Sequence, residues 1–326
     1  MEQFLALLAE MPELQQLVVS MRGEAPCSLV RVAAEVRPHL LHLLREQTGR
    51  DIFYVFSSEY HARRAAEAYV YPEGILLPAP QAELRPVEAQ SAEVRHARVQ
   101  ALDRLHQRGG VVFASVESLL SRMRPPEKFF AQYVTLREGQ TVSPQNLLRS
   151  LSRAGYEYTS LIEGAGQISG RGEMVEVFPP GAAQPLRITF FDEEIESIRA
   201  FDADSQRSFG GNIAAVNIPP AHEFAMDAEE TAQLRRYFEA AKEEKLDAVR
   251  ETYLLSLEES GSFSNIEAYV SLLEAQASAL SYAKDPIVVF EDGAAILAEQ
   301  RERLQSQTAM FSEIVAEGGA FGVEIL

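Results

Sequence analysis

The chain contains a single cysteine, Cys27, among 326 residues. One cysteine excludes an internal disulfide bond and is typical of a protein in a reducing cytoplasm, where we expect Cys27 to be a small buried packing residue. No apolar run approaches the ~20 residues that a transmembrane helix needs, and the acidic start of the chain lacks the basic segment of a secretory signal. We therefore expect a cytoplasmic protein with no membrane partner.

Lysine is also scarce, with four residues in the chain, and the formal net charge is −18. A protein that binds duplex DNA unaided needs clustered basic residues to displace counterions, so we expect no direct nucleic-acid binding. The negative charge is concentrated in residues 220–326, which hold 8 basic and 21 acidic side chains. This third could mimic DNA or act as an intramolecular lid, but a solvated acidic surface explains it more simply.

Signatures of catalysis are missing as well. No lysine follows a glycine, so the phosphate-binding pattern G-x-x-x-x-G-K-[ST] is absent, and "GEAPCSLV" stands in its place. The chain has no G-x-S-x-G, H-E-x-x-H or C-x-x-C pattern, and its six histidines lack the spacing of a zinc site. Acidic pairs follow two of the expected strands, at Glu291-Asp292 and Asp192-Glu193. Such pairs are common at strand ends, so without a phosphate loop they do not indicate a nucleotide site. We predict no enzymatic activity, cofactor, metal or small-molecule substrate.

What the sequence does contain is an alternation of buried strands and helices in its two flanks. "DIFYVF", "GGVVFAS" and "DPIVVFED" are continuous apolar strands, and amphipathic helices are expected at 57–69, 87–107 and 293–307. A helix opened by Ser28 is expected to run into the forties with a bend at Pro38, 72–86 is expected to be a loop, and 265–280 a helix. This rhythm predicts an α/β fold with one parallel sheet built from both flanks.

Between the flanks the pattern changes to short strands separated by Gly and Pro turns, with one helix at 144–155. We predict a small α+β domain with an antiparallel sheet at 133–219, inserted into an α/β domain formed by 1–132 and 220–326.

The segment "PLRITFFDEEIESIRAF", residues 185–201, reads as a β-hairpin with an acidic turn. Side chains alternate along a strand, so Ile188 and Phe190 share one face while Arg187, Thr189 and Phe191 share the other. The Ile/Phe face is the one expected to be buried, which leaves a bulky aromatic ring beside an arginine on the opposite face.

Arg171 precedes a glycine that is expected to take a positive φ in a turn, and it can reach the same face as Arg187 and Phe191. Arginine and aromatic side chains on a rigid face are the usual components of a binding hot spot. The alternative is that both arginines pair with Glu173 or Glu196 and that Phe191 packs against the α/β body. From the spacing of these residues in the sequence alone, we favour this internal pairing and packing over an exposed binding face.

The string "GQISGRGEMVEVFPPGAAQPLRITFFDEEIESIRAFDADSQRS", followed by "IPPAHEF", resembles the corresponding stretch of the bacterial transcription-repair coupling factor family, and the excision-repair protein UvrB has a related version. "GGVVFASVESLLSRMRPP" and "DPIVVFEDGAAILAEQRERL" are similar to the strand–helix segments that flank the inserted domain in that family. The resemblance implies the N-terminal UvrB-homology module, either as part of a longer coupling factor or as a stand-alone truncated paralogue.

In these families the inserted domain docks UvrA, the damage-recognition ATPase. The resemblance implies that Arg171, Arg187 and Phe191 dock UvrA, and Arg199 also matches the motif. It further implies a RecA-like α/β domain with a degenerate nucleotide site, and a non-enzymatic module that binds UvrA as UvrB does. The competing hypothesis is a nucleotide-dependent RecA-like ATPase or DNA-remodelling enzyme, which has only the α/β body in its favour.

Overall fold

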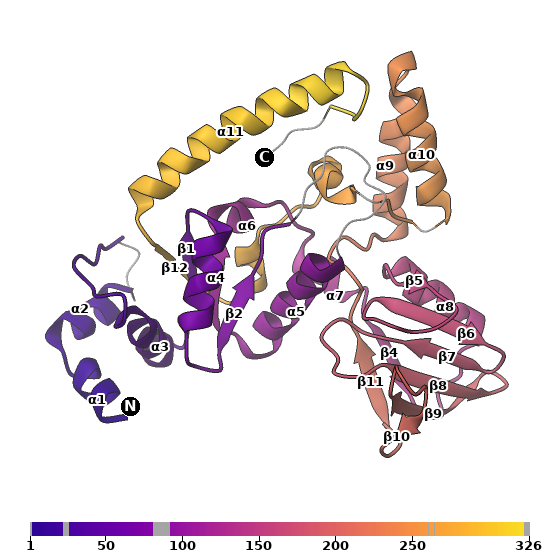
Figure 1. Ribbon diagram of the computed structural model, residues 1–326, viewed down its shortest axis with the longest axis horizontal. Coiled ribbons are helices and arrows are strands. Elements are labelled where there is room, and N and C mark those ends of the chain that lie inside the picture. The colour runs from indigo at the N-terminus through magenta and orange to yellow at the C-terminus, as the bar shows by residue number, and fades with distance from the viewer. Residues whose placement is uncertain (1, 22–25, 81–91, 260, 264, 323–326) are drawn as a thin grey trace. The chain divides into compact units, whose positions relative to one another are not determined.

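The computed structural model describes residues 2–21, 26–80, 92–259, 261–263 and 265–322 (Figure 1). The chain divides into two compact units, each made of three segments. The first unit comprises Met1–Ala79, Ala101–Ser121 and Ala279–Arg303, and the second comprises Pro80–Gln100, Arg122–Ser278 and Leu304–Leu326. Residues 133–219 lie entirely in the second unit. The domain boundaries at 132/133 and 219/220 stay a prediction.

The first unit is built on a four-stranded parallel sheet. Its order is β12 (Ile287–Phe290), β1 (Ile52–Phe56), β3 (Val111–Ser115) and β2 (Gly74–Leu77). Every residue of β1 and β3 is buried, as continuous apolar runs require in the centre of a parallel sheet. The prediction that both flanks of the chain contribute to one parallel sheet is confirmed, because β12 pairs with β1.

Helices surround this sheet. Those that lie wholly in the first unit are α1 (Glu2–Ala9), α2 (Pro12–Met21), α3 (Arg37–Thr48), α4 (Glu59–Ala68), α6 (Val116–Leu120) and the 3-10 helix η3 (Ala279–Tyr282). Two more helices, α5 (Ala92–Arg108) and α11 (Gly293–Ala316), run from one unit into the other. Leucines of α1, α2 and α3 pack with side chains of β1, β3 and β12 in one apolar core.

Three sequence predictions for the first unit are wrong. Helix α3 begins at Arg37 rather than Ser28, and Pro38 lies in its first turn, where a missing N–H costs nothing. Cys27 is exposed instead of buried, because it lies in the irregular segment 26–36 that precedes this helix. The predicted loop at 72–86 contains strand β2, which is defined by its pairing with β3. Its residues 81–86 lie outside the described residues.

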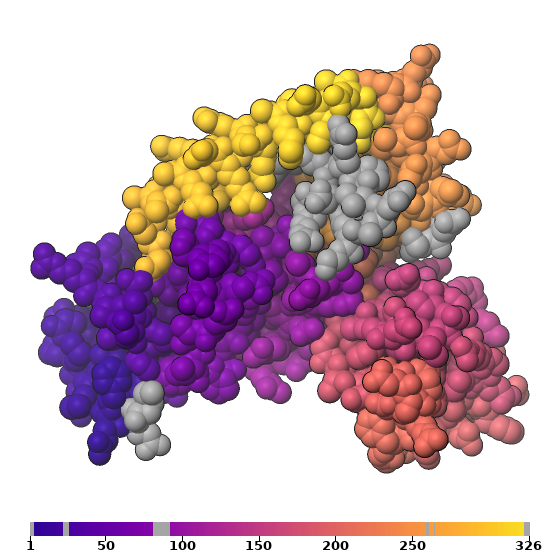
Figure 2. Space-filling model, viewed as in Figure 1, coloured from indigo at the N-terminus to yellow at the C-terminus, as the bar shows by residue number. Residues whose placement is uncertain are grey.

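The antiparallel sheet that was predicted for the middle of the chain lies in the second unit. Its six strands run in the order β10 (Ser208–Phe209), β9 (Glu194–Phe201), β8 (Leu186–Phe191), β7 (Met174–Val177), β6 (Gln167–Arg171) and β5 (Glu157–Tyr158). All neighbours are antiparallel except β5 and β6. In the space-filling view this part of the chain, coloured pink to orange, forms one compact lobe (Figure 2).

One face of this sheet is covered by helix α8 (Pro144–Arg153). The hydroxyl of Ser143 caps the helix by accepting the N–H of Asn146 at 3.3 Å. Leu147 and Leu151 then pack into a core formed by alternate residues of the strands. The two-residue period of the strands and the amphipathic period of the helix therefore define an inner, dry face and leave the opposite face of the sheet uncovered by α8.

The second unit also contains a two-stranded ribbon and a helical part. The remaining elements are α7 (Pro126–Phe130), β4 (Val134–Arg137), β11 (Ala215–Ile218), α9 (Ala228–Ala240), η1 (Glu244–Leu246), α10 (Asp247–Glu259) and η2 (Ile266–Leu272). Aromatic side chains centred on Phe238 form a separate core. The helix predicted at 265–280 is wrong in type, because that stretch forms two short 3-10 helices, η2 and η3.

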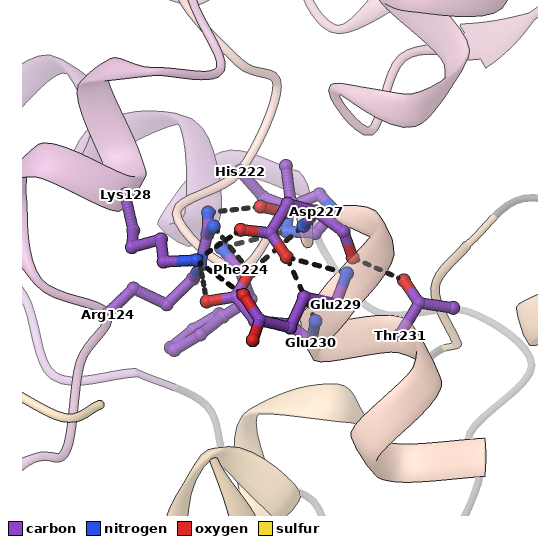
Figure 3. A network of polar contacts seen from close by, with 9 residues as sticks. Arg124, Lys128, His222, Phe224, Asp227, Glu229, Glu230 and Thr231 are labelled. Atoms are coloured by element: carbon purple, nitrogen blue, oxygen red, sulfur yellow. Dashed lines mark hydrogen bonds and ion pairs between the residues drawn. The ribbon is translucent and has the colours of Figure 1, made fainter. Parts of the chain in front are cut away.

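Two ion pairs, one of them buried, join the chain segments that precede β4 and follow β11 (Figure 3). The guanidinium of Arg124 is fully buried and donates to both carboxylate oxygens of Glu230, at 3.0 and 2.6 Å. Lys128 pairs with Asp227 at 2.6 Å, and Asp227 and Glu230 form the capping box of α9. These contacts bind the entry and exit of the antiparallel sheet to one helix start.

No helix within the described part of the chain has both the length and the apolar character needed to cross a membrane.

Candidate functional site

The hairpin β8–β9 forms as the sequence predicts. Its tight turn lies at Asp192, which has a φ of +60°, and the strands on either side pair from Phe191 with Glu194 onward. Ile188 and Phe190 are 0% and 3% exposed, so they form the inner face. Arg187, Thr189 and Phe191 lie on the outer face, and the predicted alternation is confirmed.

Phe191 leaves 76% of its surface exposed at the end of β8. An exposed ring of this size gains almost nothing from burial on folding, so the fold itself does not require it. Packing of Phe191 against the α/β body, which was the alternative interpretation, is therefore wrong.

Arg187 is held by its own chain. Its Nε and Nη2 both donate to Oε1 of Glu176, at 2.8 and 2.5 Å, and its Nη1 lies 3.2 Å from the hydroxyl of Ser208. The guanidinium also lies 4.6 Å above the centre of the Phe201 ring. The alternative of internal pairing therefore applies to Arg187, but its partner is Glu176 rather than Glu173 or Glu196.

Arg171 lies at the end of β6, where Gly172 takes the expected positive φ of +59°. Its side chain is exposed, and its Nη2 donates to the backbone carbonyl of Ser160. The turn after β6 lies next to the turn after β8, because the N–H of Phe190 donates to the carbonyl of Glu173 at 2.9 Å. Arg171 and Phe191 therefore stand at the same end of the sheet.

Arg199 lies on β9 directly opposite Arg187 and is exposed. Since Glu176 pairs with Arg187 in the register of β7 and β8, the three residues form one row across three strands. The row nearer the turns contains Thr189 opposite Ser197. The outer face thus brings together the four residues that the resemblance singled out.

The second unit also contains a buried cluster of charged residues around a small cavity, which the sequence did not reveal. Arg98 is 1% exposed and pairs with Glu223, which is 4% exposed, and Nε of Arg95 lies 3.2 Å from Oε1 of Glu267. The cavity is lined by these residues and His222, among others. Burial raises the pKa of Glu267 to about 7, although Arg95 opposes this shift. Charged residues on an amphipathic pattern gave no signal that they would be buried.

The first unit holds a third cluster, at the start of α3, after the segment where a nucleotide-binding domain would have its phosphate loop. Arg37 pairs there with Glu291, and the hydroxyl of Tyr54 donates to the same carboxylate. Burial and the neighbouring carboxylate raise the pKa of Tyr54. Of the segment "GEAPCSLV", residues 23–25 lie outside the described residues. Asp292, the other acidic residue at this strand end, accepts the N–H of Ala295 in the first turn of α11.

Comparisons with known proteins agree on one family of relatives. Residues 134–224 match the family model of the UvrB interaction domain. Over 89% of its length, this chain is 26% identical to a transcription-repair-coupling factor of Bacillus subtilis (strain 168), of which the match covers 26%. It is 36% identical to the factor of Escherichia coli (strain K12) over 36% of this chain and 10% of that protein.

The factor of Staphylococcus aureus (strain USA300) is 27% identical over 79% of this chain and 22% of its own length. The chain thus spans about a quarter of the length of the curated relatives that it matches most extensively. It resembles the N-terminal UvrB-homology module of these factors, and the outer face of β6–β9 lies within the matched interaction domain.

Proposed function

We propose that this chain is a non-enzymatic protein-interaction module of DNA repair that docks UvrA through the outer face of β6–β9, as UvrB does. The observation that carries the proposal is Phe191, a ring 76% exposed on a rigid strand beside arginines, within the segment that matches the UvrB interaction domain. Exposed aromatic and arginine side chains on a fixed scaffold are the residues that most often dominate the free energy of protein binding.

The contacts of the arginines refine their proposed roles. Arg187 is fixed by Glu176 and by the ring of Phe201, so it offers a partner a preorganised guanidinium at little entropic cost. Arg171 and Arg199 are exposed and add positive charge to the same face. We expect the partner to present an apolar pocket for Phe191 and, separately, acidic groups that contact the arginines of this face.

The non-enzymatic part of the proposal is supported by the contacts at the start of α3. A helix N-terminus at this place would be suited to a phosphate group. Here the carboxylate of Glu291 accepts from Arg37 and Tyr54. With no Gly-Lys pair in the sequence, we propose that the α/β unit is a RecA-like scaffold that does not turn over nucleotide.

The proposed module would recruit UvrA to stalled transcription as part of a coupling factor, or compete with UvrB for UvrA as a separate protein. Both roles use the same surface. The proposal includes a cytoplasmic location and no direct contact with nucleic acid, membrane or small-molecule substrate.

The proposal is tested by titrating purified UvrA with the wild-type chain and with Phe191→Ala. We expect the substitution to weaken binding by about 2 kcal/mol or more, roughly 30-fold in Kd, because a hot-spot ring is lost. Tyr60→Ala is the matched control, since Tyr60 is 67% exposed on α4 in the first unit. Equal affinities of wild type and Phe191→Ala would remove this surface as the docking site.

A further inference from the structure

The row Glu176–Arg187–Arg199 on the outer face contains two guanidinium groups and one carboxylate. In an antiparallel sheet, residues directly opposite one another have their side chains within interaction distance. Glu176 stands opposite Arg187, and Arg187 stands opposite Arg199. The row therefore has one positive charge more than its own carboxylate neutralises.

The carboxylate of Glu176 is committed to Arg187. The side chain of Glu176 is 5% exposed, that of Arg187 is 18% exposed, and a single oxygen accepts two guanidinium N–H groups at 2.8 and 2.5 Å. A pair so far removed from water is stable only with precise geometry, which fixes the plane of the guanidinium. Ser208 and the Phe201 ring constrain the same plane.

Arg199 has no such partner. The described part of the chain contains neither a hydrogen bond nor an ion pair to this exposed side chain, and its cross-strand neighbour is another arginine. Like charges placed directly opposite each other destabilise a sheet. The fold thus places a second guanidinium directly opposite the Arg187–Glu176 pair.

The remaining positive charge fits one compact anion better than a polyanion. Three exposed acidic residues, Glu173, Asp192 and Glu193, occupy the two turns at the end of this face. They would repel a nucleic-acid backbone, which carries a charge at every phosphate. A single carboxylate of a protein partner can contact Arg199 and stay clear of these turns.

We propose that Arg199 is the residue of this face that binds a carboxylate side chain of the partner, and that Glu176 is the positioning residue that neutralises Arg187 and fixes its orientation. The inference rests on the proposed docking of UvrA and assigns to Arg199 the charge-dependent part of that binding. Phe191 then supplies the apolar part.

The test is a titration of UvrA with full-length chain variants over a series of salt concentrations. Arg199→Gln should weaken binding about tenfold at low salt and reduce the dependence of Kd on salt, because a charge-assisted contact is lost. Arg149→Gln is the matched control, since Arg149 is an exposed arginine on α8, the helix that covers the opposite face. It should leave both quantities unchanged.

For Glu176→Gln, the dependence of Kd on salt distinguishes a positioning role from a purely structural one. It removes the internal anion of Arg187 and leaves a second unneutralised guanidinium in this row, so Kd should depend more steeply on salt than in the wild type. If this variant unfolds, the double variant Glu176→Gln/Arg187→Gln keeps a neutral pair and should return the salt dependence to that of the wild type. An unchanged dependence in the Glu176→Gln variant would contradict the positioning role.

The free protein provides an independent measurement. Thermal unfolding of Arg199→Gln at low salt should give a Tm equal to or above that of the wild type, because a like-charge pair is removed. A lower Tm would show that Arg199 supports the sheet, and the inference would be overturned.

The outcomes separate this inference from the proposed function. If Phe191→Ala weakens UvrA binding while Arg199→Gln does not, the docking surface stands and the assignment of Arg199 is wrong. If neither substitution has an effect, both the proposed function and the assignment of Arg199 are wrong. If wild-type chain binds a DNA duplex and Arg199→Gln abolishes that binding, the anion is a phosphate, which also overturns the inference.

Discussion

At the scale of single residues, the environment of a charge decides what it can do. Arg187 and Arg199 are adjacent on the same face, yet one is neutralised by Glu176 and the other faces solvent. In the buried cluster of the second unit, the same principle acts on groups that titrate. Glu267 and His222 both line one cavity, and burial displaces their pKa values in opposite directions.

Glu267 should make the protein less stable as the pH rises. Burial raises the pKa of its carboxyl to about 7 from an ordinary value of 4.5. The folded state therefore binds a proton more tightly than the unfolded state, and the resulting stability is present below about pH 4.5 and is lost as the pH rises through about 7. We expect Glu267→Gln to have a higher Tm relative to wild type at about pH 8 than at about pH 5. Parallel Tm-versus-pH curves would contradict this.

His222 should make the protein less stable as the pH falls below about 6.5. Its buried ring accepts the N–H of Phe224 at Nδ1, and burial, with help from Arg95 and Arg124, lowers its pKa to about 3 from 6.5. The stability from the neutral ring is present above about pH 6.5 and is lost as the pH falls towards about 3. His222→Gln should lose this acid-dependent component in urea unfolding measured across that range, whereas the exposed His61 changed to Gln should retain it.

At the scale of elements, two helix ends in the second unit are held by specific contacts. Helix α8 ends before Gly155, which has a φ of +90° and packs against the ring of His222. Helix α9 begins with the capping box of Asp227 and Glu230. Both ends therefore combine a local backbone requirement with a tertiary contact.

Gly155→Ala should destabilise the protein by well over the ~1–2 kcal/mol that left-handed backbone costs a residue with a side chain. A Cβ at this position would lie 2.3 Å from a ring carbon of His222, so the ring or the backbone must move. Gly210→Ala is the matched control, because Gly210 has a φ of +71° with no atom within 4 Å of a Cβ. Chemical denaturation should show a clearly larger loss for Gly155→Ala, and equal losses would refute the packing argument.

Asp227→Ala should remove the cap of α9 and its ion pair with Lys128 together. Its carboxylate accepts the N–H groups of Glu229 and Glu230 at 3.0 and 2.9 Å. Loss of an N-cap costs about 0.5–2 kcal/mol. Asp227→Asn keeps an acceptor for the cap but loses the charge, so its free energy of unfolding should lie between those of wild type and Asp227→Ala. A double-mutant cycle with Lys128→Gln would measure the ion pair.

At the scale of the whole molecule, the two units contain different kinds of sheet. The first closes a parallel sheet with strands from both flanks, and the second carries the antiparallel sheet with its exposed outer face. A parallel sheet of this kind is common among nucleotide-binding enzymes, but a fold does not imply a function. Whether the first unit can hydrolyse nucleotide depends instead on the side chains around the start of α3.

We expect no ATP turnover above background by the full chain, alone or with DNA and UvrA. The sequence lacks the Gly-Lys pair of a phosphate loop, and Glu291 is engaged by Arg37 and Tyr54 at the start of α3. A phosphate-release assay measures this, with UvrA alone as the reference for its own turnover. Turnover by the chain alone that Glu291→Gln abolishes would identify an enzyme and contradict the proposal.

Local pattern determined much of this structure. The alternation of strands and helices predicted the parallel sheet, because a buried strand needs only a continuous apolar run. The period of two along residues 186–191 placed Phe191 outside and Phe190 inside, because side-chain direction in a strand depends on the immediate neighbours alone. The long motif that contains Arg171, Arg187 and Arg199 indicated the similarity to the coupling factors.

Only the tertiary structure decided which charges meet. Arg187 pairs with Glu176 across a strand pair, and Arg98 pairs with Glu223, 125 residues further along the chain. Strand β2 exists because β3 supplies its hydrogen-bonding partner, and Cys27 is exposed because the segment around it is neither helix nor strand. A periodic pattern reports the direction of a side chain, whereas the partner of a charge depends on register and topology, which the whole chain sets together.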